Sequence, residues 1–212
     1  MDKTKDSASL WTGSFGDEYT VRNSQVPNRR AFWETITLKY LTDQKPVDPE
    51  HLDVQKPKKV IEVGCNIGAN LKYLAELAPW AYLLGTDVNA LALEAVNDRK
   101  ITTMQANLFK MPWYFMHVFD LVVCIGVLVH TLDEELDDAI RAVFRLSRKH
   151  VLIGEYWAQE WTPIPYHGYE NALRKGPFDH RIAAVAHKLP IETGFLDKGD
   201  GFDRVTWWMY KV

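Results

Sequence analysis

The chain has 212 residues, of which 47% are hydrophobic and 25% charged, and its formal net charge at pH 7 is −3. This length and apolar content favour one domain with a substantial core. The small negative charge gives no general attraction to a phosphate backbone, so nucleic acid is an unlikely partner. No stretch is apolar for long enough to span a bilayer, so no membrane partner is expected.

The two cysteines, Cys65 and Cys124, have neither the spacing of metal ligands nor that of a disulfide framework. We therefore expect no metal site and a cytoplasmic, reducing environment. The first nine residues lack the apolar core of a signal peptide, which agrees with this expectation.

The segment before the first clear strand is dense in aromatic, glycine and charged residues. Residues 11–23 have no clean period, which indicates a lid or a poorly ordered arm. Residues 29–41 carry apolar side chains that predict an amphipathic helix. Residues 42–59 contain three prolines and many charges, and we interpret them as a surface connection.

A strand, a glycine turn and a helix follow at residues 60–78. The β-branched residues at 60, 61 and 63 predict a buried parallel strand, and apolar residues at helical spacing from position 69 predict a helix. A turn between two such elements brings the backbone close to a ligand at the carboxyl end of a sheet. The turn from Gly64 to Gly68 is therefore a candidate ligand site.

The residues in and before this turn indicate the kind of ligand. A dinucleotide site requires a glycine at the position of Asn66, so NAD is disfavoured. Glu62 places a carboxylate at the mouth of the turn, where it suits an ammonium or a sulfonium group. Asp87 ends the next strand about twenty residues further on, where an acidic residue accepts hydrogen bonds from ribose hydroxyls.

The remaining elements alternate between strands and helices. Strands are expected at residues 101–106, 119–127, 150–157, 191–196 and 204–211, and helices at 90–98, from 133 and at 179–189. We expect Asp133 to cap its helix. Residues 157–178 interrupt this alternation as a long irregular insertion, and such insertions are usually functional.

The glycine turn, Asp87 and the strand at 119–124 together resemble the class I S-adenosylmethionine-dependent methyltransferases. The resemblance implies an α/β, Rossmann-like three-layer sandwich with a mostly parallel seven-stranded sheet and an antiparallel edge hairpin. In one domain, residues 1–57 would form the lid and helical lead-in, 58–156 the cofactor core, 157–178 the acceptor-side insertion, and 179–212 the last helix and edge hairpin. The cofactor would be S-adenosylmethionine, with S-adenosylhomocysteine as product.

The same resemblance implies a set of cofactor-binding residues. Arg22 would pair with the methionine carboxylate, and Asn107 stands where many members carry an aspartate that accepts from the adenine amino group. A surface position for Arg22 remains an alternative. The implied set is Tyr19, Arg22, Glu62, Gly64, Cys65, Asn66, Gly68, Asp87, Val88, Asn107, Leu108 and Ile125.

A general base is needed only if the acceptor is a hydroxyl or a protonated amine. The candidates are His167, Glu155 and His130, in that order. His130 stands where related sequences often carry a histidine, although a histidine after an apolar strand can also hold a loop.

A narrower resemblance covers nearly the whole chain. Residues 11–23, the glycine turn, residues 163–175 and the Thr206-Trp207-Trp208 ending look like the methylases associated with pseudaminic acid biosynthesis. It implies a small, sugar-linked acceptor. Aromatic and basic residues of the insertion would hold an acidic substrate, unless they only cover and solvate a loop. These residues are Tyr166, His167, Tyr169, Arg174 and Lys175.

Two alternatives remain open. The chain could methylate a protein, a lipid-linked glycan or a nucleic acid, or it could be a cofactor-binding module without catalysis. The sequence predicts neither the oligomeric state nor whether oxygen or nitrogen is methylated.

Overall fold

The computed structural model describes residues 7–42, 57–166 and 169–212. Within these residues, seven strands form one sheet in the order β3-β2-β1-β4-β5-β9-β8. The parallel strands are β1 (Lys59–Val63), β2 (Tyr82–Asp87), β3 (Ile101–Gln105), β4 (Phe119–Ile125) and β5 (Ser147–Glu155). The antiparallel strands are β8 (Pro190–Leu196) and β9 (Val205–Lys211). This arrangement confirms the predicted Rossmann-like fold and its edge hairpin.

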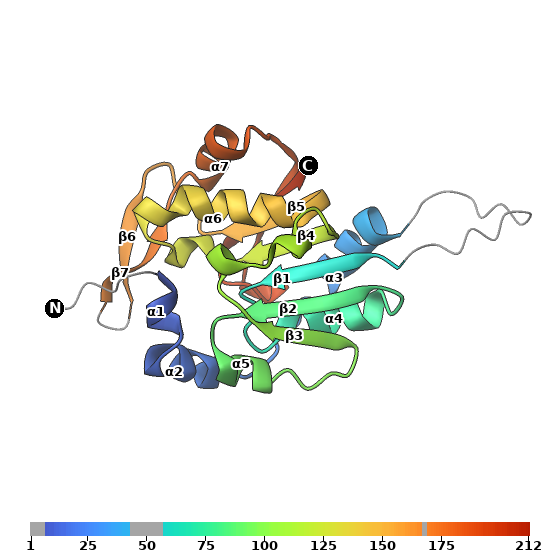
Figure 1. Ribbon diagram of the computed structural model, residues 1–212. Coiled ribbons are helices and arrows are strands. Elements are labelled where there is room, and N and C mark those ends of the chain that lie inside the picture. Colours follow the sequence, from blue (N-terminus) through green and yellow to red (C-terminus); the bar gives the residue numbers. More distant parts are fainter. Residues whose placement is uncertain (1–6, 43–56, 167–168) are drawn as a thin grey trace, which may run out of the picture.

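Helices cover both faces of the sheet (Figure 1). One apolar core lies between the sheet and the helices α6 (Asp133–Leu146) and α7 (Phe178–Ala186). The other lies under α3 (Arg30–Ile36), the π-helical turn η1 (Thr37–Leu41) and α4 (Ala69–Leu77). The short helix α5 (Ala90–Glu94) follows β2 and ends earlier than predicted.

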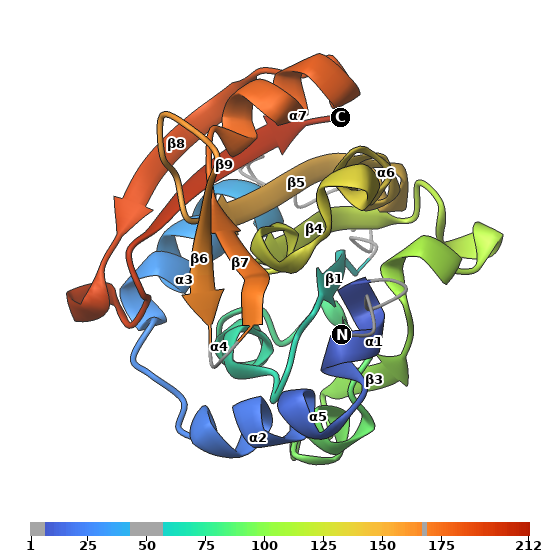
Figure 2. The same ribbon diagram turned by 90° about the vertical axis from the view of Figure 1, so that its left-hand side faces the viewer.

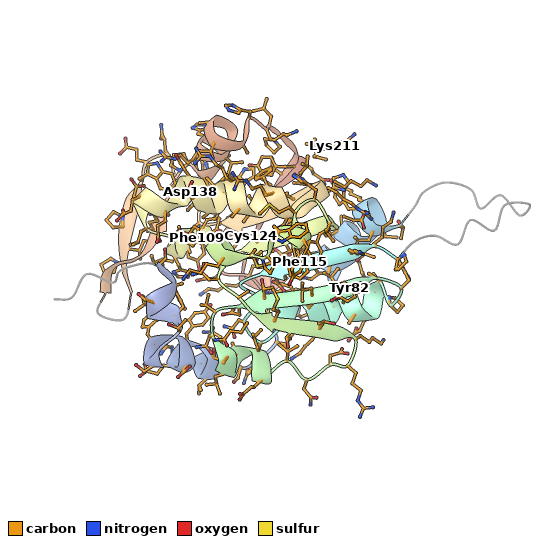
Figure 3. All side chains as sticks on the ribbon, viewed as in Figure 1. Tyr82, Phe109, Phe115, Cys124, Asp138 and Lys211 are labelled. Atoms are coloured by element: carbon orange, nitrogen blue, oxygen red, sulfur yellow. The ribbon has the colours of Figure 1, made fainter. Side chains whose placement is uncertain are left out.

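The central strands are buried on both faces, which explains their continuous apolar sequence. In β4, the side chains of Leu121, Val122 and Cys124 are fully buried. Figure 3 shows Cys124 inside the molecule, between the layers. Burial raises the pKa of its thiol, so Cys124 is an unreactive core residue.

The N-terminal segment is helical, so of the two expectations for it, a lid or a poorly ordered arm, the second is wrong. It forms α1 (Ser7–Trp11) and α2 (Ser14–Arg22). The Trp11 ring packs edge-on against Phe15 and Tyr19, with ring centroids 5.1 and 5.3 Å away. These aromatic contacts join the two short helices, although the sequence has no clean apolar period.

The insertion is also regular, which corrects a second expectation. Its strands β6 (Thr162–Tyr166) and β7 (Tyr169–Lys175) form an antiparallel hairpin. The prolines of β6 are tolerated because β6 has a partner on one side only. Asp133 does not cap α6: Leu132 is the capping residue, and Asp133 is the first helical residue.

The helices α1 and α2 and the hairpin lie at one end of the sheet. In Figure 1, α1, α2, β6 and β7 lie at the left, where the arrowheads of the parallel strands point, and Figure 2 faces this end. The short helices η2 (Leu108–Lys110), η3 (Trp113–Phe115), η4 (Leu128–His130) and η5 (Lys198–Asp200) complete the loops. None of the helices that the structure describes is long and apolar enough to cross a membrane.

Candidate functional site

A cavity of about 880 Å³ lies at the carboxyl ends of the parallel strands. Its lining comes from the turns after β1, β2, β3 and β4, from α1 and α2, and from the hairpin. Open α/β sheets bind ligands at this edge, and the volume is typical of a small-molecule site. Of the twelve predicted cofactor residues, all except Gly68 line this cavity.

The glycine turn has the left-handed backbone that its sequence predicts. The φ angles of Gly64, Asn66 and Gly68 are 66°, 47° and 70°. A Cβ atom on Gly64 would lie 2.5 Å from Cγ2 of Val127. Glycine is therefore needed here, because any side chain would clash with the turn after β4. Gly68 instead begins α4 as its capping residue. The turn thus fixes the shape of the cavity floor.

Glu62 brings a buried carboxyl group to this floor. Its side chain is 2% exposed, and Oε1 accepts a hydrogen bond from Asn70 at 2.5 Å. Oε2 is buried and has no hydrogen-bond partner among the described residues. Burial raises the pKa of Glu62 to about 8. An unpaired buried oxygen is costly, and a ligand that donates a hydrogen bond would satisfy it.

Arg29 is a cavity residue that sequence reasoning missed. It donates to the carbonyl of Gly201 at 2.9 Å and to Oδ1 of Asn70 at 2.8 Å. Its guanidinium lies 4.2 Å from the ring centre of Phe202. Burial lowers the pKa of Arg29, and the Glu62 carboxyl opposes this. These contacts hold a cation beside Glu62, which is a suitable pair for a ligand that carries both charges.

Arg22, the arginine that the sequence predicted for this role, is held much more loosely. It lines the cavity, and within the part of the chain that the structure describes it pairs with Glu18, at 3.5 Å. Both side chains are substantially exposed, at 37% and 70%. An exposed ion pair of this kind contributes little free energy, so Arg22 can exchange partners.

Asp87 is fixed at the end of β2 by two backbone amides. Oδ2 accepts from the amide of Asn66 at 2.8 Å, and Oδ1 accepts from the amide of Asn89 at 2.9 Å. Burial raises the pKa of Asp87, and these amides oppose the rise. Each carboxylate oxygen still has acceptor capacity for a ligand hydroxyl. Asn89, which the sequence did not single out, donates to the Trp11 carbonyl and to Asp17, and so joins α1 and α2 to the end of β2.

The loop after β3 forms a further wall. Oδ1 of Asn107 accepts from the amide of Phe109 at 2.9 Å and begins η2. The carbonyl expected to face an adenine therefore has one contact already, and its second lone pair remains for a ligand. Val88, Leu108 and Ile125 add apolar surface to the lining.

The cavity lining also contains aromatic rings. The His130 ring lies 4.4 Å from that of Trp11, centroid to centroid. Tyr156 and Asp203, neither of which was predicted, also line the cavity, and the Tyr156 hydroxyl donates to Asp203 at 3.3 Å. Ile164 and Leu173 reach the cavity from the hairpin.

Glu155 lies outside this cavity, which disagrees with its expected place beside the acceptor. It is fully buried and accepts from the amides of Val127, Leu128 and Val129 at 3.1, 2.8 and 3.2 Å. Glu155 therefore holds the turn that carries His130. In this position the carboxyl group stabilises the backbone of the turn after β4 and does not reach the cavity.

The basic residues of the insertion also lie outside the cavity lining. Arg174 donates to Asp133 at 2.9 Å and to the carbonyl of Thr131, and its guanidinium lies 5.3 Å from the ring centre of Trp161. It fastens the hairpin to the start of α6. Lys175 is exposed.

For three of the predicted residues, the structure does not describe where the side chain lies relative to the cavity. His167 lies outside the described residues, and the side chains of Tyr166 and Tyr169 are likewise not described, although both residues pair across the hairpin.

Thermal stability should fall with rising pH, partly through Glu155. Burial raises its pKa from 4.5 to about 8. The unfolded chain releases this proton first, so the stability that the neutral form contributes is complete below pH 4.5 and is lost as the pH rises through about 8. Glu155→Gln cannot titrate, so its melting temperature should depend less on pH in this window. Equal pH dependence of the two melting curves would exclude this role for Glu155.

Comparison with known proteins shows what the chain is similar to. Residues 60–150 match the family described as methyltransferase domain. This stretch runs from β1 into β5. The chain is also 27% identical over 154 residues to methyltransferase GfsG of Streptomyces halstedii. The match takes in 63% of this chain and 53% of that protein, so the chain spans about half the length of this curated relative.

Solved methyltransferases share the fold along most of the chain. The 1,6-didemethyltoxoflavin-N1-methyltransferase of Burkholderia thailandensis, solved with S-adenosylhomocysteine, superposes with a TM-score of 0.67 at 11% identity, over 93% of this chain and 83% of that one. The magnesium protoporphyrin IX methyltransferase of Synechocystis, solved with S-adenosylmethionine, gives 0.64 at 14% identity, over 100% and 99%.

The two solved methyltransferases contain S-adenosylhomocysteine and S-adenosylmethionine, and residues of this cavity would fit such a ligand. The unpartnered Oε2 of Glu62 could accept from the ammonium group of the cofactor's methionine part, and the guanidinium of Arg29 could bind its carboxylate. Asp87 retains acceptor capacity for ribose hydroxyls.

Proposed function

We propose that this chain transfers a methyl group from S-adenosylmethionine to an oxygen or nitrogen of a small, sugar-linked acidic acceptor. The observation that carries the proposal is one cavity lined both by charged side chains, among them Arg29, Glu62 and Asp87, and by the rings of Trp11, Tyr19 and His130. We assign the charged residues to the cofactor and call their part of the cavity the charged end. We assign the rings to the acceptor and call their part the ring-lined end.

At the charged end, each polar residue has a distinct task. Arg29 binds the cofactor carboxylate, and Oε2 of Glu62 accepts from its ammonium group. Asp87 accepts from the ribose hydroxyls, and Asn107 and Leu108 hold the adenine. The bound cofactor supplies a methyl group already activated on a sulfonium, so the protein contributes mainly alignment of the acceptor.

At the ring-lined end, Trp11 and Tyr19 give flat apolar surfaces for a sugar face, and Ile164 and Leu173 close the hairpin side. Because Arg29 binds the cofactor carboxylate, Arg22 remains available to bind an acidic group of the acceptor. Lys175 can add to this attraction from the surface, whereas Arg174 is occupied by Asp133.

A proton acceptor is available if the acceptor atom is a hydroxyl or a protonated amine. His130 lines the cavity and is the described histidine best situated for this task. His167 remains a second candidate on the hairpin. Glu155 acts indirectly, because it holds the turn on which His130 lies.

The alternatives have less support. A cavity roofed by α1, α2 and the hairpin favours a small acceptor over a folded protein or a nucleic acid, although a lipid-linked glycan could insert its sugar. The small-molecule name of the Burkholderia protein agrees with this preference. A binding module without catalysis would not need a ring-lined second compartment.

The test is methyl transfer to candidate acceptors. The purified chain is incubated with methyl-labelled S-adenosylmethionine and a panel of acidic and neutral sugar nucleotides, and both S-adenosylhomocysteine and labelled product are measured by mass spectrometry. Transfer to an acidic sugar supports the proposal. Binding of the cofactor without transfer to any panel member, together with transfer to a protein or nucleic acid, would overturn it.

Arg29→Ala is expected to weaken S-adenosylmethionine binding far more than Arg22→Ala. Loss of a charged hydrogen bond costs about 1.5–3 kcal/mol, or roughly a 10- to 150-fold loss of affinity. Arg22→Ala should leave the affinity nearly unchanged, because Arg22 is partly exposed and its ion pair with the exposed Glu18 contributes little free energy. Calorimetry measures the affinity of both variants. A larger loss of affinity in Arg22→Ala than in Arg29→Ala would show that Arg22, and not Arg29, binds the cofactor carboxylate.

A further inference from the structure

The two edges of the sheet differ in their exposed side chains. On β3, the exposed residues are the polar Thr102, Thr103 and Gln105. On β8, the exposed residues include Ile191 and Phe195, which are 53% and 56% exposed. Leu189, just before β8, is 77% exposed. The same domain therefore has one polar edge and one apolar edge.

The apolar edge also lacks most of the devices that keep strand edges apart. Proteins protect edges with charged side chains, prolines and bulges. In β8, Pro190 and the register shift before Glu192 affect only the start of the strand, and the pairing from Glu192 to Leu196 is regular. Glu192 is bound by Lys39 at 2.5 Å and by the Tyr40 hydroxyl at 2.6 Å. These contacts lower the pKa of Glu192 and neutralise the charge of the strand.

The position of β8 leaves this edge accessible among the described residues. β8 is the last strand of the sheet, with β9 on one side only. Figures 1 and 2 show the lid helices α1 and α2 at a different place on the molecule.

We propose that β8 pairs with β8 of a second copy of this chain in antiparallel fashion, about a two-fold axis at Thr193. In this register, Ile191 of each copy lies opposite Phe195 of the other, because both are two residues from Thr193. Glu192 of each copy lies opposite Gly194 of the other, so the two Glu192 side chains do not face each other. The strand is thus self-complementary, as a two-fold interface requires, and aromatic and β-branched side chains form favourable cross-strand pairs.

A single pair of strands is a small interface, so the dimer forms in a concentration-dependent way. The pairing joins two sheets into one continuous sheet and satisfies the outward amides and carbonyls of β8. It is independent of methyl transfer, because Ile191, Thr193 and Phe195 are absent from the cavity lining.

Sedimentation velocity of the full chain over a wide concentration range tests the proposal. The parent chain should show a concentration-dependent dimer, and Phe195→Lys should be monomeric throughout, because it places two charges opposite Ile191. Thr103→Lys is the matched control on the polar edge and should leave the dimer unchanged. A parent chain that is monomeric at every concentration, or a dimer that persists in Phe195→Lys, overturns the proposal.

The register is tested by cross-linking. Directly opposite Cα atoms in antiparallel strands are about 4.5–5.5 Å apart, within the reach of a disulfide. Thr193→Cys should therefore oxidise to a covalent dimer. Ile191→Cys should not, and the double variant Ile191→Cys, Phe195→Cys should. The native Cys65 and Cys124 are buried, so they do not compete. Cross-linking of Ile191→Cys in preference to Thr193→Cys would overturn the two-fold at Thr193.

Discussion

Asp87→Ala is expected to lower the affinity for S-adenosylmethionine by about 1.5–3 kcal/mol, or roughly 10- to 150-fold. The carboxylate would lose its hydrogen bonds to the ribose hydroxyls. The alanine also leaves the amides of Asn66 and Asn89 without their acceptor, so the glycine turn itself loosens. Isothermal titration calorimetry on the parent chain and the variant measures the change.

Asp138→Ala is the matched control for this measurement. Asp138 lies on α6, on the side away from the lid helices, and pairs with Arg141 at 2.9 Å (Figure 3). Its replacement should leave the affinity unchanged. Asp87→Asn separates the two roles of the aspartate, since its amide oxygen can still accept one amide but carries no charge. Parental affinity in Asp87→Ala would remove Asp87 from the cofactor site.

The parts of the site that the sequence predicted are those built from neighbouring residues. Glu62, the glycine turn and Asp87 lie on consecutive strands, and parallel strands bring their carboxyl ends together by topology alone. The short sequence pattern of each strand and its following turn is then sufficient to predict that these residues lie at the same edge of the sheet. The fold was predictable for the same reason, because buried strands and amphipathic helices each leave a periodic pattern.

Arg29 was not predictable, because its position depends on contacts across the chain. Its partners are Asn70 and Gly201, which lie 41 and 172 residues away in sequence. The sequence shows an arginine at the start of a helix and nothing that separates it from Arg22 or Arg30. An available signal was the asparagine on the first turn of α4, since a buried asparagine requires partners.

In the insertion, the residues that line the cavity differ from those that the sequence singled out. Residues 157–178 do reach the cavity, but through Ile164 and Leu173. Arg174 was expected to bind substrate because arginine is the usual partner of acidic groups. Asp133, at the start of α6, already takes that contact, and only the fold brings the two together.

Gly64→Val is expected to destabilise the protein and to abolish measurable cofactor binding. The φ angle of 66° costs an L-residue about 1–2 kcal/mol. The added Cβ would lie 2.5 Å from Val127, and overpacking of this kind costs about 1–3 kcal/mol more. Relief requires Val127 to move, and Val127 is held by Glu155. For a chain of this size, each kcal/mol lowers the melting temperature by about 2–4 °C.

A matched pair of alanine variants separates backbone strain from the steric clash. Gly126 has nearly the same φ angle, 68°, but a Cβ there would meet nothing within 4 Å. Gly126→Ala should therefore lose only the strain of about 1–2 kcal/mol. Gly64→Ala should lose more, because it adds the contact with Val127, and thermal unfolding measures both. If the two variants melt at the same temperature, Val127 yields without cost, and the rigid contact between the glycine turn and the turn after β4 does not exist.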